Sequence, residues 1–62
     1  MNIEIHYKGS QYSAEYTITY NLDTGSEIHT IELNYYTMTL FNTGHSLEEV
    51  LENIKTTLDM IP

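Results

Sequence analysis

The chain has 62 residues and a formal net charge of −7, with nine acidic side chains, two basic ones and no cysteine. This length predicts a single small acidic domain over residues 1–62. Without cysteine, disulfides, thiolate metal sites and cysteine nucleophiles are excluded. The shortage of Lys and Arg argues against direct contact with nucleic acid, and no apolar run approaches the roughly 18 residues that a membrane span requires.

A chain of this size buries a limited core, since a domain of about 60 residues removes only about 60% of its unfolded surface from water. We therefore expect a homodimer, because a second copy is the simplest partner that adds buried surface. The lack of cysteine and of a basic, apolar leader segment favours a cytoplasmic location.

Alternating apolar and polar side chains predict two strands in the first third of the chain, each with one buried face. Ile3, Ile5 and Tyr7 share the apolar face of the first strand, and residues 9–11 are expected to form a turn. Residues 23–26 contain Asp and Gly, which favour a turn into a third strand. The apolar face of the second strand comprises Ala14, Tyr16, Ile18, Tyr20 and Leu22.

Residues 27–41 alternate less regularly, because the apolar positions change from odd to even numbers at Tyr35 and Tyr36. Either one long strand carries a β-bulge here, or two strands meet at a bend. The absence of Gly or Pro at this point favours the single bent strand.

A C-terminal helix is predicted to begin at Ser46, which forms an S-x-x-E capping box with Glu49. Apolar residues then recur at helical spacing and form one stripe. The expected fold is α+β, with a three- to four-stranded antiparallel sheet in the order β-β-β-α and the amphipathic helix packed on one face. The stripe comprises Leu47, Val50, Leu51, Ile54, Leu58 and Ile61.

Residues 22–26 read Leu-Asp-Thr-Gly-Ser, which resembles the D-T-G-S signature of aspartic proteases. In that family the aspartate activates water as part of a carboxylate dyad. The apolar-apolar-Gly segment that should follow is absent here, so we interpret the motif as a hairpin turn and predict no catalytic residue and no enzyme activity. His6, His29 and His45 have no metal-ligand spacing, so we also predict no metal and no cofactor.

Acidic residues on the polar sheet face form the first candidate site. Glu4, Glu15 and Glu32 are predicted to share this face, with Asp23 and Glu27 at the hairpin. A negative surface attracts basic partners and repels nucleic acid. In size and charge the chain is similar to small phage proteins that inhibit host or defence proteins, some of them as DNA mimics. This similarity implies a larger host protein with a basic surface as the partner.

Exposed tyrosines form the second candidate site, because tyrosine provides a large contact area at small entropic cost. Tyr35 and Tyr36 are adjacent, so in a strand they would point to opposite faces, and Tyr12 is a further exposed candidate. The alternative function is therefore a homodimeric assembly module that pairs through its bent, tyrosine-rich strand.

Overall fold

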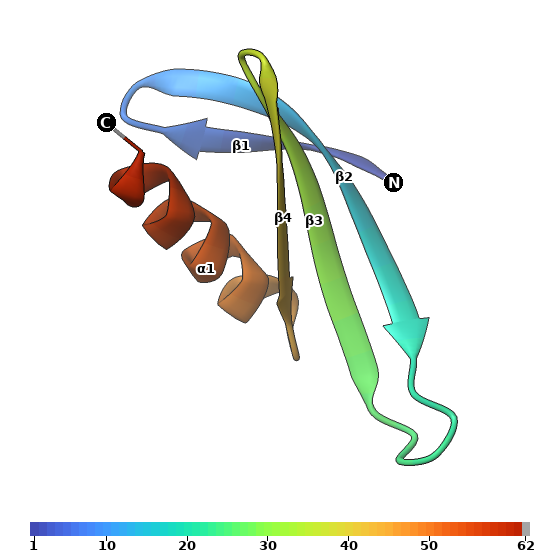
Figure 1. The fold of residues 1–62 in the computed structure, drawn as a ribbon. Helices are drawn as coiled ribbons and strands as arrows, with labels where there is room; N and C mark the ends of the chain where they lie inside the picture. The colour runs from blue at the N-terminus through green and yellow to red at the C-terminus, as the bar shows by residue number, and fades with distance from the viewer. Residues whose placement is uncertain (62) are drawn as a thin grey trace.

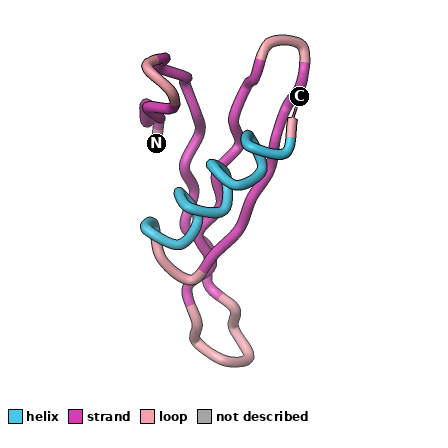
Figure 2. The backbone as a smooth tube through the Cα atoms, turned by 90° about the vertical axis from the view of Figure 1, so that its left-hand side faces the viewer, coloured by secondary structure: helices cyan, strands magenta, loops and turns pink. Residues whose placement is uncertain are grey.

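A computed structural model describes residues 1–61 of the chain. The four strands form one antiparallel sheet in sequence order, and the helix packs against one face of it, over the third and fourth strands (Figures 1 and 2). The predicted α+β class is confirmed, with the sheet at the four-stranded end of the expected range. The elements are β1 (Asn2–Tyr7), β2 (Ser10–Tyr20), β3 (Glu27–Tyr35), β4 (Met38–Gly44) and α1 (Leu47–Met60).

Two of the three hairpins close with two-residue turns. Tyr7 pairs with Ser10 across the first turn, so this turn begins at Lys8, one residue earlier than expected. The φ angles of Lys8 and Gly9 are +49° and +79°, and positive φ is what two-residue hairpin turns require.

Of the two alternatives for residues 27–41, the single bent strand is wrong and two strands are present, because the chain reverses at Tyr36 and Thr37. Tyr35 pairs with Met38 across this turn, and Tyr36 adopts a φ of +55°. A bulky residue rarely adopts this conformation. The Tyr36 ring packs edge-on against the Tyr35 ring, with 4.7 Å between the ring centroids. The residue with the strained backbone therefore also makes an aromatic contact.

Strand pairing divides the side chains between a face under α1 and a face that no element of residues 1–61 covers, here called the open face. Pairs such as Ile31 with Tyr16, and Leu33 with Leu40, point toward α1. Their sequence neighbours point the other way, since side chains alternate along a strand. The open face comprises Asn2, Glu4, His6, Gln11, Ser13, Glu15, Thr17, Thr19, Ile28, Thr30, Glu32, Asn34, Thr39, Phe41 and Thr43.

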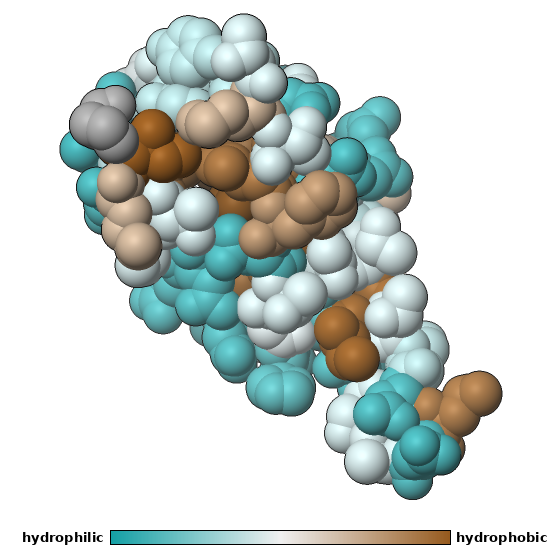
Figure 3. Space-filling view, viewed as in Figure 1, coloured by the Kyte–Doolittle hydropathy of each residue, from teal (hydrophilic) through white to brown (hydrophobic). Residues whose placement is uncertain are grey.

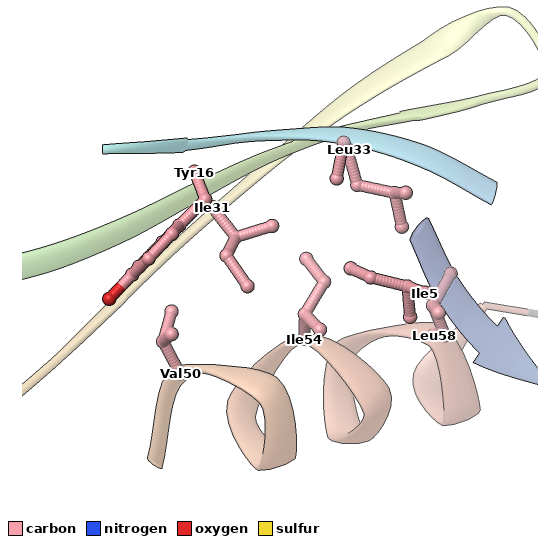
Figure 4. Close-up of a cluster of buried hydrophobic side chains, with 8 residues drawn as sticks. Ile5, Tyr16, Ile31, Leu33, Val50, Ile54 and Leu58 are labelled. Atoms are coloured by element: carbon pink, nitrogen blue, oxygen red, sulfur yellow. The ribbon is translucent and has the colours of Figure 1, made fainter. Parts of the chain in front are cut away.

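The core lies between α1 and the inner face of the sheet (Figure 4). Of the predicted stripe of the helix, Val50, Ile54 and Leu58 are buried. Leu51 and Ile61 are partly buried, and Leu47 is exposed because it lies at the start of the helix. The three buried residues pack against side chains from the first three strands. The buried apolar residues are Ile5, Ala14, Tyr16, Ile31, Leu33, Val50, Ile54 and Leu58.

The predicted N-terminal cap of α1 is present. Ser46 has extended backbone angles, and its side-chain oxygen accepts a hydrogen bond from the backbone N–H of Glu49 at 3.1 Å. Glu48 and Glu49 lie in the first turn, where negative charge interacts favourably with the helix dipole.

The far end of the β2–β3 hairpin projects beyond the helix (Figure 1). An 11-residue strand is about 37 Å long and a 14-residue helix about 21 Å, so α1 covers only part of β2. Ile18, Tyr20 and Leu22, predicted on the apolar face, are therefore 42%, 64% and 96% exposed. Figure 3 shows apolar side chains at the surface of this projecting end.

Candidate functional site

The open face brings together three of the predicted acidic residues. Glu15 lies directly opposite Glu32 in the β2–β3 pairing, and Glu4 is opposite Ser13 in the β1–β2 pairing. Directly opposed residues in a sheet have Cβ atoms about 4.5–5.5 Å apart, so the Glu15 and Glu32 side chains leave the sheet side by side. Like charges in this arrangement destabilise the sheet.

A shallow depression of about 280 Å³ lies beside the Glu15–Glu32 pair on the open face. Its lining residues are Asn2, Ser13, Ala14, Glu15, Glu32 and Asn34.

One positive group reduces the charge of this region. The Met1 amine lies 3.1 Å from Oε1 of Glu15, which remains half-exposed. Neither lysine contributes, since Lys8 lies in the β1–β2 turn, 3.8 Å from Asp59, and Lys55 lies on α1. The open face is therefore a polar surface with net negative charge.

The other two predicted acidic residues lie outside this face. Asp23 is in the exposed β2–β3 loop, where its backbone N–H donates to the Asn21 side chain at 2.9 Å. Glu27 points to the helix side of the sheet, because it pairs with Tyr20. Its carboxylate lies 3.1 Å from Nε2 of His29. The open face therefore carries three of the five candidate carboxylates, and the other two lie at the β2–β3 hairpin.

The Asp-Thr-Gly-Ser motif forms this same loop. The Gly25 N–H donates to the Asn21 carbonyl at 2.7 Å, and Gly25 has a φ of +71°. The Thr24 hydroxyl donates to the Ser26 hydroxyl at 3.0 Å. These local bonds match the predicted turn.

A buried hydrogen-bond chain, which sequence reasoning missed, links Tyr16, His29 and Glu27. The Tyr16 hydroxyl lies 2.5 Å from Nδ1 of His29, whose side chain is only 9% exposed. An ionised carboxylate can only accept, so Nε2 of His29 must donate to Glu27. In the neutral ring Nδ1 then accepts from the Tyr16 hydroxyl. The chain satisfies the polar atoms of His29 beside the apolar core.

The three candidate tyrosines meet at one end of the sheet, near the β3–β4 turn. The Tyr12 and Tyr35 rings lie 5.3 Å apart, and Tyr35 also contacts Tyr36. The expectation that Tyr35 and Tyr36 point to opposite faces is wrong, because Tyr36 belongs to the turn. Tyr36 is 82% exposed, and repulsion from the neighbouring Tyr12 and Tyr35 phenolates raises its pKa.

Within residues 1–61, no group of three His, Cys, Asp or Glu side chains is arranged to hold a metal ion. The helix of this part of the chain is too short and too polar to cross a membrane.

No protein-family model, no curated protein and no solved structure matches this chain.

Proposed function

We propose that this chain is a non-enzymatic binding module whose open face contacts a basic surface of a larger protein. The main observation in support of this proposal is that Glu15 and Glu32 lie directly opposite each other on neighbouring strands. Two like charges across neighbouring strands reduce the stability of the fold. Local arrangements that oppose folding concentrate at functional surfaces, where a partner compensates for them.

A partner that handles nucleic acid fits this surface best. Such proteins carry clusters of Lys and Arg that neutralise several phosphates at once. Glu4, Glu15 and Glu32 offer these side chains a rigid set of anionic groups on adjacent strands. In this proposal the chain acts as a small inhibitor of the phage type, which occupies the site of the nucleic acid in a host or defence protein.

Immobilised protein, exposed to a lysate of the host cell, tests this function. The wild-type chain should retain one basic protein in stoichiometric amount, and duplex DNA should displace it. A double variant, Glu15→Lys with Glu32→Lys, should raise the Kd for this partner by about tenfold or more, equivalent to about 1.4 kcal/mol or more.

The matched control is Glu48→Lys with Glu52→Lys on α1, where both side chains are exposed. This double variant changes the net charge by the same amount as the sheet variant but leaves the open face unchanged. The control protein should therefore still bind the partner. Equal loss from both double variants would show that net charge alone matters. Undiminished retention by the sheet variant would exclude the open face as the contact.

A further inference from the structure

The outer edge of β4 carries unpaired backbone groups. Within residues 1–61, β4 has a neighbouring strand on one side only, and in Figure 1 it lies in front of the other strands. The two residues that flank a two-residue turn bond to each other through both their N–H and C=O groups. In the next residue of each strand these groups point away from the partner strand, and the two orientations then alternate along the strand. Tyr35 and Met38 flank the turn between β3 and β4. The N–H and C=O groups of Thr39 and Phe41 therefore point away from β3.

The contact made by Thr43 supports this assignment. Its backbone carbonyl accepts a hydrogen bond from Nδ2 of Asn53 on α1 at 2.9 Å, so it too points away from β3. Thr39, Phe41 and Thr43 are all exposed.

The sequence of β4 lacks the features that normally keep an edge strand from pairing. Natural edges carry charged side chains, proline or a bulge. β4 reads Met-Thr-Leu-Phe-Asn-Thr-Gly and keeps an unbroken register with β3. The opposite edge, β1, carries Glu4 and His6 at positions whose backbone also faces outward. Only one of the two edges is therefore suited to pairing with another strand.

We propose that β4 pairs in antiparallel orientation with β4 of a second copy of this chain, about a twofold axis at Phe41. This register uses the whole seven-residue strand. Phe41 lies opposite the partner's Phe41, and Thr39 lies opposite the partner's Thr43. The Phe41 pair exchanges two hydrogen bonds, because the backbone groups of both residues are directed outward. In each pair of Thr39 with Thr43, the Thr43 N–H donates to the Thr39 carbonyl. The Thr43 carbonyl accepts from the Thr39 N–H through its second lone pair, since Asn53 occupies the first.

The side chains favour a second copy as the occupant. Phe41 is 65% exposed, and the twofold axis brings an identical ring against it. Aromatic pairs directly opposite one another stabilise antiparallel sheets. The same operation on β1 would place Glu4 opposite the partner's Glu4, where like charges repel.

The acidic side chain of the sheet that lies nearest the twofold axis does not oppose this dimer. Glu32 is the nearest acidic neighbour of Phe41 within the sheet. Three strand spacings separate Glu32 from the partner's Glu32, a distance of about 14 Å, which exceeds the screening length of about 8 Å at physiological salt. The dimer is independent of the proposed function, since it uses the β4 edge and leaves Glu4 and Glu15 uncovered.

Sedimentation equilibrium over a concentration series tests the dimer. The wild-type mass should be twice the 7.2 kDa of one chain, about 14.4 kDa. Phe41→Lys and Phe41→Glu should each reduce it to 7.2 kDa, because each places like charges together on the axis. An equimolar mixture of the two variants should restore the dimer, since opposite charges then meet. Tyr36→Lys is the matched control and should remain dimeric, because Tyr36 lies in the turn outside β4.

A wild-type chain that stays monomeric at every concentration would overturn the proposal. Failure of the mixture to associate would exclude Phe41 from the axis, and dissociation of Tyr36→Lys would exclude the β4 edge as the specific contact. Amide hydrogen exchange provides a measurement that needs no variant. In the wild-type protein the Thr39 and Phe41 amides should exchange slowly, and exchange at the rate of unpaired amides would contradict the pairing.

Discussion

Gly44 lies directly against Val50: a Cβ atom at position 44 would stand 2.9 Å from the Val50 backbone nitrogen. Real Cβ atoms essentially never approach another atom so closely. Gly44 is the last residue of β4, and Val50 lies in the first turns of α1. Both residues are buried. The missing side chain at position 44 therefore allows the start of the helix to pack onto the end of the sheet.

Replacing Gly44 with alanine should reduce the free energy of unfolding by about 1–3 kcal/mol, the usual cost of an added methyl group in a packed interior. The backbone of α1 must move, because the nearest atom is a main-chain nitrogen. Urea unfolding measures the loss. Thr43→Ala, one residue away on the open face, is the control and should cost less than 1 kcal/mol. Equal midpoints for Gly44→Ala and the wild-type protein would contradict the close contact.

Replacing Tyr16 with phenylalanine should lower the free energy of unfolding by about 1–3 kcal/mol, because the buried Nδ1 of His29 loses its donor. Chemical denaturation measures this change. Tyr20→Phe, on the same strand and 64% exposed, should change stability by less than about 0.5 kcal/mol.

Repeating the Tyr16 substitution in a protein that lacks His29 separates the loss of this hydrogen bond from other effects of changing the Tyr16 ring. In a His29→Leu protein no imidazole nitrogen remains to be satisfied, so adding Tyr16→Phe should cost less than about 0.5 kcal/mol. The same loss in both backgrounds would mean that the Tyr16 hydroxyl does not act through His29.

The contact between Tyr7 and Asp59 should make stability depend on alkaline pH. The Tyr7 hydroxyl donates to the Asp59 carboxylate, and this hydrogen bond raises the pKa of Tyr7 above its ordinary value of 10.0. In the unfolded chain Tyr7 loses its proton first. The stability from this pair is therefore fully present below about pH 10 and is lost as the pH rises through the raised folded-state pKa.

Urea midpoints between neutral and alkaline pH measure this dependence. Tyr7→Phe removes the titrating group, so its midpoint should fall less steeply above pH 10 than that of the wild-type protein. Tyr20→Phe should keep the wild-type slope. Parallel profiles for all three proteins would show that Tyr7 holds its proton no more tightly in the folded chain than in the unfolded one.

Patterns within a single element predicted most of the fold. The alternation in β2 and the stripe of α1 depend on local periodicity, and the Ser46 cap depends on two residues three positions apart. The same alternation placed Glu4, Glu15 and Glu32 on one face. Sequence alone also placed Tyr20 in the core, because periodicity gives the direction of a side chain but not the length of the helix that covers it.

The missed features depend on contacts between elements. Tyr36 forms a tight turn without glycine, and the aromatic contacts beside it come partly from Tyr12 on another strand. The chain of Tyr16, His29 and Glu27 requires the register of β2 against β3, which fixes which side chains share a buried site. The sequence offered one sign of this site: His29 has the same parity as Ile31 and Leu33, and thus faces the core.

The order of the strands has a consequence for how the chain folds. Each strand pairs with its sequence neighbours, and α1 follows β4 directly, so most contacts join nearby segments, which favours rapid folding. The bond between Tyr7 and Asp59 spans 52 positions, and Ile5 meets the end of α1 in the core (Figure 4). Closing so long a loop costs more entropy than forming a hairpin. We therefore expect the contacts between β1 and the end of α1 to form last in folding and to break first in unfolding.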